Sequence, residues 1–469
     1  MNVRALLYLA MGGFVLVLGG CRFALQNTVR GTTTVRDSRI FYPGRHGPLT
    51  KQDLNWGKIA WKYFQNNYQP GTGLVSTTDK GNTATIWTFG DSLAALYSAR
   101  RLNLVDDREV NLRLTALLNF LNSMPLAGDV LPNRTYRTDS GGPLGPKGDP
   151  GMDGWSSVDL GRLLIWLRLD RKLSPAMSEF FDKSVLRWDV CRALDASGSL
   201  YGGTVQDSAI KTFQEGRLGY EEYAARGFES WGFATDQASK IDPFATTRIL
   251  GVEVYYDSRD ERSTGILAPV VSLPYLLDGI EFNWDRSDSS KDSDHSQTYG
   301  ELAQRIYRVQ EARFKQQGRL TARTDHQLSH APFFVYDSIF ASGYPWNTIS
   351  ASGQHDSQDA LVATQVVFPM RALWKTSYTN TLTEAVKHLY DPERGWYEGR
   401  YEATGGAETL ITARTNAAVL ESLAYQVDGQ LLRQAGGNRL FKIEVKDPFG
   451  KTAPCISTGS KDTRGVKVQ

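Results

Sequence analysis

The sequence has few of the residues that build metal or redox centres. Its 469 residues include 3 cysteines and 6 histidines, and no His-Glu-x-x-His motif occurs. His326 and His330 are four residues apart, a spacing that could place two ligands on one helical face. Pro332 follows them, however, and proline interrupts helical spacing. We therefore expect no metal site and no cofactor.

Other signatures are missing as well. There is no phosphate-binding loop, no dinucleotide fingerprint and no Gly-x-Ser-x-Gly nucleophile motif. Lys and Arg number 53 against 51 Asp and Glu, so no strong basic excess indicates a nucleic-acid partner. After the first 20 residues no apolar run approaches the roughly 20 residues needed to span a bilayer.

The N-terminus has the pattern of an export signal. Arg4 supplies a positive charge, and residues 5–20 are apolar or small. The ending Leu18-Gly-Gly-Cys21 resembles the lipobox of bacterial lipoproteins, which implies cleavage before Cys21 and lipidation of its sulfur. Arg22 follows, and by resemblance to known sorting rules this favours the outer membrane. We expect a periplasmic protein, attached to the membrane through Cys21.

Composition along the chain predicts four segments. They are a lipoprotein signal peptide at 1–20, a polar tether at 21–48, an α-toroid domain at 49–440 and a C-terminal tail at 441–469 with a short strand at 440–445. Cys191 lies in the large domain and Cys455 in the tail. The two could pair in an oxidising envelope, but the sequence does not show whether they are close.

Apolar periodicity predicts a mainly α fold. Helical patterns cover 51–67, 90–103, 108–123, 156–169, 175–193, 206–216, 219–233, 271–283, 296–317, 358–375, 379–389 and 414–427. Strand patterns are limited to 251–256, 333–336 and 396–397. By analogy at the level of the fold, twelve helices suit an (α/α)6-type toroid with long polar loops and a few short strands. A helical solenoid is the alternative.

Aromatic and acidic residues recur together just before predicted helices. Aromatics make up 11% of the chain, and 11 residues are tryptophan. Sugars stack on aromatic rings and hydrogen-bond to carboxylates, so this composition suits a glycan cleft, although it equally suits a large core. The local pairings are Trp87 with Asp91, Trp155 with Asp153 and Asp159, Tyr220 and Tyr223 with Glu221 and Glu222, Glu229 with Trp231, Asp278 and Glu281 with Trp284, and Trp396 with Glu398 and Glu402.

Several of these motifs resemble those of DUF3131, a bacterial family of envelope proteins defined as a domain of unknown function. The matching segments are Trp87…Asp91-Ser-Leu-Ala-Ala-Leu, Gly154-Trp-Ser-Ser-Val-Asp-Leu-Gly-Arg, Tyr220-Glu-Glu-Tyr-Ala-Ala-Arg-Gly-Phe…Trp231-Gly, Pro274-Tyr-Leu-Leu-Asp-Gly-Ile-Glu281 and Gly395-Trp-Tyr-Glu-Gly…Thr415-Asn-Ala. The resemblance covers roughly residues 50–430 and implies an α-toroid and a polysaccharide context. It transfers no catalytic residues.

Glycoside hydrolysis usually needs two carboxyl groups, one acid and one base or nucleophile. Our candidates are Asp91 as base, at a helix start, facing Glu222 or the adjacent Glu221 as acid, with Asp153 or Asp159 in support. The candidate substrate-binding residues are Trp87, Trp155, Tyr220, Tyr223, Trp231, Glu281, Trp396, Glu398, Arg414 and Asn416. Alternatively, these acids cap helices or pair with arginines.

The sequence therefore predicts an envelope lipoprotein that cleaves or trims a bacterial polysaccharide. One alternative is a non-catalytic glycan-binding lipoprotein that works with exopolysaccharide machinery in export or assembly. Another is a polysaccharide lyase. A hydrolase, a lyase and a binding protein would differ in the products they release.

Overall fold

The computed structural model describes residues 44–206, 209–284 and 298–432 together with Cys455. These residues belong to one compact unit. The expected signal peptide, the lipidation site Cys21, most of the tether and the strand at 440–445 lie outside the described residues. Within the described residues, no helix is both long enough and apolar enough to cross a membrane.

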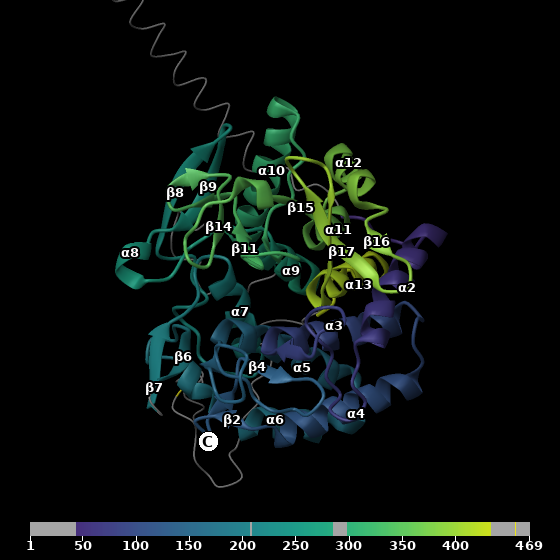
Figure 1. Cartoon of the computed structure of the whole chain (residues 1–469), viewed down its shortest axis with the longest axis vertical. Coiled ribbons are helices and arrows are strands. Elements are labelled where there is room, and N and C mark those ends of the chain that lie inside the picture. Colours follow the sequence, from purple (N-terminus) through teal and green to yellow (C-terminus); the bar gives the residue numbers. More distant parts are fainter. Residues whose placement is uncertain (1–43, 207–208, 285–297, 433–454, 456–469) are drawn as a thin grey trace, which may run out of the picture. The chain divides into compact units, whose positions relative to one another are not determined.

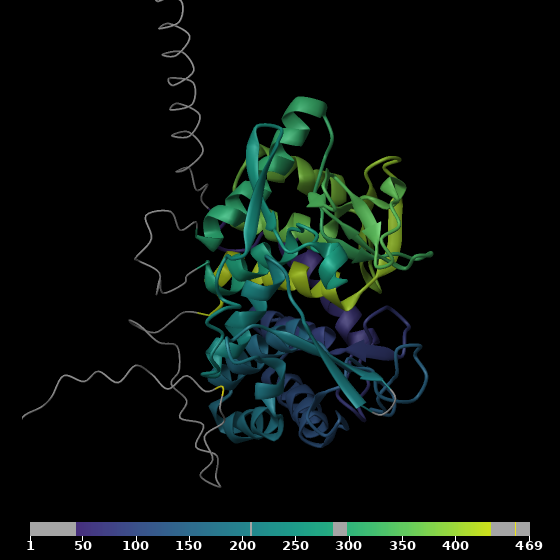
Figure 2. The ribbon, with the colours of Figure 1, turned by 90° about the vertical axis from the view of Figure 1, so that its left-hand side faces the viewer.

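Six helices form a closed series at the centre of the unit. They are α3 (Ile86–Arg101), α5 (Ser157–Leu173), α7 (Tyr220–Ser230), α9 (Leu273–Phe282), α11 (Thr364–Leu373) and α13 (Ala413–Asp428). Each contacts the next in chain order, and α13 contacts α3. In Figures 1 and 2, α13, in yellow, lies between the blue helices α4 and α6 and the green helices α10 and α12. These six inner helices are buried along most of their length, which places the core around them.

Five further helices pack against the inner six. They are α2 (Lys51–Asn66), α4 (Asp107–Ser123), α6 (Ser178–Arg187), α10 (Tyr299–Gln317) and α12 (Ser377–Val386). Helix α2 packs on α3 and α13, α4 on α3, α6 on α5, α10 on α9, and α12 on α11. Between α7 and α9 the chain forms the hairpin of β8 (Phe244–Ile249) and β9 (Val252–Asp257), followed by the short α8 (Glu261–Thr264). The predicted mainly α class is confirmed.

Short strands precede most of the inner helices. Strands β1 (Thr83–Thr85), β5 (Gly154–Trp155), β15 (Leu361–Ala363) and β18 (Ala407–Ile411) end directly before α3, α5, α11 and α13. The hydroxyls of Thr85, Ser156 and Thr412 cap α3, α5 and α13, because each accepts an otherwise unpaired backbone N–H of the first turn.

The strands form small antiparallel sheets. The first sheet has the order β5–β6–β7, with β6 at Tyr201–Gln206 and β7 at Ala209–Gln214. The second has the order β10 (Asp325–Gln327), β11 (Phe334–Asp337) and β14 (Thr348–Ser350). In the third, β17 (Gly395–Tyr401) lies between β15 and β16 (Tyr390–Asp391) and also pairs with β18. Two-stranded sheets join β1 with β4 (Thr135–Arg137), β2 (Leu126–Ala127) with β3 (Leu131–Pro132), and β12 (Phe340–Ala341) with β13 (Tyr344–Pro345). The three predicted strand segments fall in β9, β11 and β17.

The helix predicted at 206–216 is wrong, because this segment belongs to the β6–β7 hairpin. Within β7, Ile210 and Phe213 are partly exposed while Lys211 and Thr212 between them are exposed, so pairing with β6 and not a regular alternation defines this strand. A side chain on Gly203 would meet the Trp155 ring, so the hairpin lies directly on that ring. The helix predicted at 175–193 is divided into η1 (Pro175–Met177), α6 and η2 (Val190–Ala193), and the one predicted at 358–375 begins as η3 (Ser357–Asp359) and β15.

A disulfide joins Cys191, in η2, to Cys455. The two Cα atoms are 5.5 Å apart, although 264 residues separate the cysteines in the sequence. The backbone N–H of Ala234 also donates to the carbonyl of Cys455 at 2.8 Å. The pairing that the sequence left open is thus present, and it attaches the chain at Cys455 to the helical unit.

Candidate functional site

A buried cluster surrounds the guanidinium of Arg162, on α5. Its Nε donates to Asp91 on α3 at 2.8 Å, and its Nη2 donates to Glu421 on α13 at 2.7 Å. Its Nη1 donates to Glu281 on α9 at 2.9 Å and to the hydroxyl of Tyr223 on α7 at 2.7 Å. All five side chains are almost completely buried. The buried cluster therefore ties together five of the six inner helices.

The buried cluster places three carboxyl groups around one cation. Burial raises the pKa of Asp91, Glu281 and Glu421, while the charge of Arg162 opposes this shift for each of them. Within the described residues, Oδ2 of Asp91 and Oε2 of Glu421 have no hydrogen-bond partner. The carboxyl groups thus favour their neutral forms more than ordinary acids do, and the cluster serves to hold the inner helices together.

A second group of acidic residues lies at the start of α5 and remains partly exposed. Burial, and next the carboxylate of Glu215, raise the pKa of Asp159 to about 6, against the opposing charges of Arg134 and Arg414. Oε2 of Glu215 accepts the backbone N–H of Ser157 at 2.5 Å and its hydroxyl at 2.7 Å. Asp159 is therefore an accessible acid that keeps its proton closer to neutral pH than an ordinary aspartic acid.

Asp325, at the start of β10, is held from two inner helices. Tyr220 of α7 donates its hydroxyl to Oδ1 of Asp325 at 2.6 Å, and Arg414 of α13 donates to Oδ2 at 2.5 Å. The Arg414 guanidinium also lies over the ring of Trp87, 4.9 Å from its centroid. Both oxygens of Asp325 thus accept hydrogen bonds, which fixes the orientation of its carboxylate.

Tyr336 connects the two acidic groups. It pairs with Asp325 across strands β10 and β11. Burial raises the pKa of its phenol to about 12, and the charges of Asp325, Glu215 and Asp159 contribute in the same direction. The charges of all three carboxylates thus act on the pKa of one phenol, that of Tyr336. We call this group the partly exposed cluster, after its partly exposed members Asp159, Glu215, Tyr220, Tyr336 and Arg414; its two other members, Trp87 and Asp325, are each 3% exposed.

The partly exposed cluster has the parts that glycoside cleavage needs. Asp159 can hold a proton near neutral pH, and Asp325 is a carboxylate whose two oxygens act as acceptors. An acid and a base placed in different environments can divide the two proton transfers of hydrolysis between them. The rings of Tyr220 and Tyr336 add partly exposed aromatic surface beside them.

Asp91 is not on accessible surface, contrary to its expected place in a glycan cleft. Its side chain is 1% exposed, and it bonds to Arg162. The prediction placed Asp91 at a helix start, but α3 begins at Ile86, so Asp91 lies in the second turn, where its carboxylate accepts from the buried Arg162. We assign the role of candidate base to Asp325, which is itself 3% exposed, because the side chains that bond its two oxygens, Tyr220 and Arg414, are partly exposed.

Glu221 and Glu222 also have protein partners. Oε2 of Glu222 accepts the backbone N–H of Gly219 at 2.6 Å and so caps its own helix. Glu221 accepts from Gln214 at 3.0 Å and pairs with Arg259 at 2.9 Å. Both glutamates are buried. The structure thus matches the alternative in which these acids cap helices or pair with arginines.

Three tryptophans expected in a cleft lie in the core. Trp155 and Trp231 are each 2% exposed, and Trp396 is fully buried. Each donates its indole N–H to a backbone carbonyl. A buried tryptophan needs such a partner, and a position beside a polar segment supplies one. The polar residues beside these tryptophans in the sequence therefore reflect the need of each indole N–H for a hydrogen-bond acceptor. The predicted position in a cleft was wrong for all three tryptophans.

Other expected binding residues are buried as well. Glu398 accepts the hydroxyls of Thr412 and Thr415, each at 2.6 Å. Asn416 accepts the backbone N–H of Trp396 at 2.8 Å and is fully buried. Tyr223 and Glu281 belong to the buried cluster. These side chains join the sheet strand β17 to the start of α13 or the inner helices to one another, and they present no surface to a ligand.

Four expected site residues do meet in the partly exposed cluster: Trp87, Asp159, Tyr220 and Arg414. Asp153 lies nearby, with its carboxylate 3.7 Å from Arg134 Nε. Sequence reasoning missed Glu215, Asp325 and Tyr336, because none of them starts a helix. The strand predicted at 333–336 contained a usable signal, since residues two apart on a strand share a face.

Within the described residues, no group of three or more His, Cys, Asp or Glu side chains is placed to hold a metal ion.

The fold is similar to those of several solved bacterial proteins. A candidate glucoamylase from Bacteroides caccae has 12% sequence identity and a TM-score of 0.59, covering 81% of this chain and 94% of its own. An endo-β-1,2-glucanase from Chitinophaga pinensis, solved with sophorotriose and glucose, has 11% identity and a TM-score of 0.58, covering 82% and 94%. A β-1,2-glucanase from Parabacteroides distasonis has 13% identity and a TM-score of 0.52, covering 81% and 57%. At these identities the likeness shows a shared fold.

No curated protein sequence matches the chain. A family described as a protein of unknown function, DUF3131, matches residues 55–429, which is most of the chain. The protein is therefore a member of the DUF3131 family, as the sequence motifs predicted.

Proposed function

We propose that the helical unit is an (α/α)6 toroid. The closed series of six inner helices supports this, as do the five helices that pack outside them. In the toroid, the β8–β9 hairpin and α8 take the sixth outer place between α7 and α9. The similar folds of glucanases and candidate glucoamylases agree with this arrangement.

We further propose that the protein is a glycoside hydrolase. The observation that carries this proposal is the placement of two unlike acids in the partly exposed cluster. Asp159 has a pKa of about 6, and Asp325 is bonded to Tyr220 and Arg414. The charges of both acids raise the pKa of Tyr336. Glycosidases use such a pair on opposite sides of the bond that breaks.

In this mechanism Asp159 gives its proton to the glycosidic oxygen as the bond from that oxygen to the sugar carbon breaks. Asp325 accepts a proton from the water whose oxygen bonds to the same carbon. Arg414 and Tyr220 keep the Asp325 carboxylate oriented during this step. Glu215, which raises the pKa of Asp159, favours the protonated form that the acid needs at the start.

The proposed substrate is a neutral polysaccharide built from glucose. The solved proteins of similar fold support this choice, since two are glucanases by name and one was solved with sophorotriose and glucose. β-1,2-Glucan is therefore the first polymer to test, followed by other glucans and then polymers of acidic sugars.

The test measures new reducing ends and ultraviolet-absorbing unsaturated ends after incubation of each polymer with purified protein. We expect reducing ends from the parent protein and at least a hundredfold lower rate for Asp159→Asn and for Asp325→Asn. Asp107→Asn is a matched control, because it makes the same change at a largely exposed aspartate. Asp107 is the first residue of α4 and pairs with Arg100 of α3. Unsaturated ends would identify a lyase. Binding without any new ends would identify a glycan-binding protein, and either result would overturn the hydrolase.

We also propose that the protein acts in the cell envelope as a lipoprotein anchored through Cys21, at the outer membrane and alongside exopolysaccharide machinery. The Leu18-Gly-Gly-Cys21 ending supports this proposal. The disulfide between Cys191 and Cys455 agrees with it, since disulfides persist in oxidising compartments such as the periplasm.

A further inference from the structure

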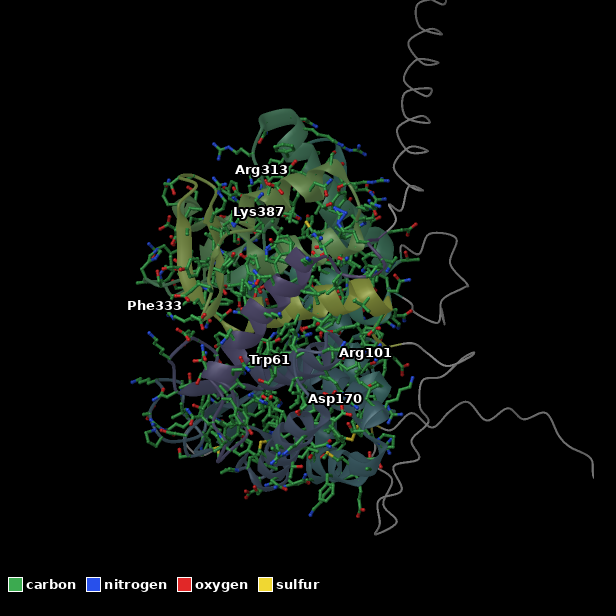
Figure 3. All side chains as sticks on the ribbon, turned by 90° about the vertical axis from the view of Figure 1, so that its right-hand side faces the viewer. Trp61, Arg101, Asp170, Arg313, Phe333 and Lys387 are labelled. Carbon is green, nitrogen blue, oxygen red and sulfur yellow. A yellow bond between two sulfur atoms is a disulfide. The ribbon has the colours of Figure 1, made fainter. Side chains whose placement is uncertain are left out.

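Phe333, in the turn between β10 and β11, has an unusual combination of conformation and exposure. Its φ is +63°, in the left-handed region that bulky residues avoid, and its side chain is 63% exposed. The turn is well defined, because Phe333 donates its N–H to His330 and accepts from Leu328. Figure 3 shows Phe333 at the outer edge of the unit. Neither burial nor local conformation explains a phenylalanine here, and such outliers often mark functional positions.

The next residues extend the aromatic surface towards the partly exposed cluster. Along β11, Val335 is buried while Phe334 and Tyr336 remain partly exposed, so these two rings share one face of the strand. Their centroids are 5.2 Å apart with the rings at right angles. Tyr336 belongs to the partly exposed cluster. Tyr336 and Phe334 thus continue the aromatic surface from the acids along one face of β11, and Phe333 adds an exposed ring in the turn directly before this strand.

The length and chemistry of this series indicate its occupant. From Tyr336 to Phe334 the strand advances about 7 Å, and Phe333 lies one residue further along the chain in the turn, so the three rings together extend beyond one sugar ring. The two ionisable groups nearest in sequence to Phe333 are His330 and Tyr336, each three residues away. His330 pairs with Asp359 at 3.0 Å, and the pKa of Tyr336 is raised to about 12, which keeps its phenol uncharged. An uncharged ligand with apolar faces, continuing from the acids, fits these features better than an anionic one.

We propose that Phe333 and Phe334 form a subsite for the chain of a neutral glycan polymer, beyond the sugar that reacts at Asp159 and Asp325. The subsite rests on the proposed hydrolase function and makes the substrate a polymer held across several sugars. In this proposal, cleavage and chain binding are carried by different residues. The acids and Tyr336 act on the bond that breaks, and the two phenylalanines hold the chain that continues past it.

The test compares polymer with a short oligosaccharide of the same linkage, using the full protein. Phe333→Gly and Phe334→Ala should each raise KM for the polymer by about threefold to tenfold, with kcat for a trisaccharide unchanged. Phe333→Gly should melt at the same temperature as the parent or higher, because glycine adopts positive φ without strain. Phe333→Tyr, which keeps a ring, should retain the polymer KM.

Phe180→Ala is the matched control, because Phe180 is 51% exposed on the outer helix α6 and far from β11 in sequence. An unchanged polymer KM in both Phe333→Gly and Phe334→Ala would overturn the subsite. If the parent cleaves no glucan, affinity electrophoresis in polymer gels replaces kinetics. Weaker retention of the two variants than of the parent then supports the subsite although the hydrolase fails. Equal retention of parent and variants, or no retention of either, overturns it.

Discussion

Arg414 donates a hydrogen bond of 2.5 Å to Oδ2 of Asp325, from the first turn of α13 to the start of β10. This bond joins an inner helix to the strand that carries the candidate base. The same guanidinium lies over the Trp87 ring, which also has Arg162 over it at 5.1 Å. Arg414 is thus positioned by an aromatic ring next to the buried cluster, and in turn it positions Asp325.

Replacement of Arg414 by lysine should reduce kcat for the glycan by about tenfold to a hundredfold, with a smaller effect on KM. Lysine keeps the charge but loses the planar fork that bonds Asp325 and lies over Trp87. Steady-state kinetics on the polymer measure this effect. Tyr220→Phe, which removes the other bond to Asp325, should act in the same direction. Full activity in both variants would show that the orientation of Asp325 does not matter for the reaction.

The activity should fall as pH rises through about 6, the pKa of Asp159, because the general acid must begin protonated. A profile of kcat/KM against pH for the parent measures this limb. Glu215→Gln removes the neighbouring charge that raises this pKa, so the limb should move to lower pH. A limb that stays in place in Glu215→Gln would argue against Asp159 as the acid.

Asp159→Asn should also change stability in a pH-dependent way. The folded-state pKa of Asp159 lies above that of an unfolded aspartate, so the folded protein binds more protons and loses stability as pH rises from about 4 to about 6. The neutral amide removes this loss. The variant should therefore gain melting temperature relative to the parent at pH 8 and show no such gain at pH 4. An equal difference in melting temperature between variant and parent at pH 8 and pH 4 would contradict the raised pKa of Asp159.

Arg162→Met should destabilise the protein by about 3–5 kcal/mol near pH 7, because it leaves three buried carboxyl groups without their cation. The loss should shrink as pH falls and these groups become neutral. Chemical denaturation at pH 7 and pH 5 measures both effects. Arg262→Met is the control: its side chain is 90% exposed, and its loss should change stability by less than about 0.5 kcal/mol.

Cys191→Ser and Cys455→Ser should each lower stability by about 2–4 kcal/mol, because either removes a cross-link over 264 residues. The double variant should cost no more than one single variant, since both break the same bond. Thermal melting of the three variants without reductant tests this. Additive losses would show that the cysteines act separately.

Cys21→Ala should abolish fatty-acid labelling of the protein and leave it either unprocessed or free of the membrane fraction. The basis is the Leu18-Gly-Gly-Cys21 ending, in which the cysteine sulfur would carry the lipid. Metabolic labelling followed by fractionation measures both effects. A Cys21→Ala protein that retains label would refute the assignment.

Most of the predicted helices are present because their signals are local. Helix α4 begins at a capping Asp106, and α10 begins at a capping box of Thr298 and Glu301, motifs that act within one turn. Where a helix prediction failed, the local signal was weak. Residues 206–216 contain too few apolar residues to separate a period of 2 from one of 3.6, and pairing with β6 decided the strand.

The sequence also determined which residue types would carry chemistry, but not which of them would meet. Arg162 is fully buried because side chains from α3, α7, α9 and α13 converge on it, and no local pattern encodes that convergence. The same limit hid Asp325 and Glu215, whose importance comes from neighbours far along the chain.

The chain by itself determined the mainly α class, the family and the starts of most helices, because these depend on spacing and capping within a few residues. Only the tertiary structure decided which carboxylates are buried and which stay accessible. Asp91 and Asp159 both lie near the start of an inner helix, yet Asp91 is 1% exposed against Arg162 while Asp159 remains partly exposed beside Glu215. The direction of each side chain relative to the helical ring makes this difference, and that direction is set by packing between distant segments.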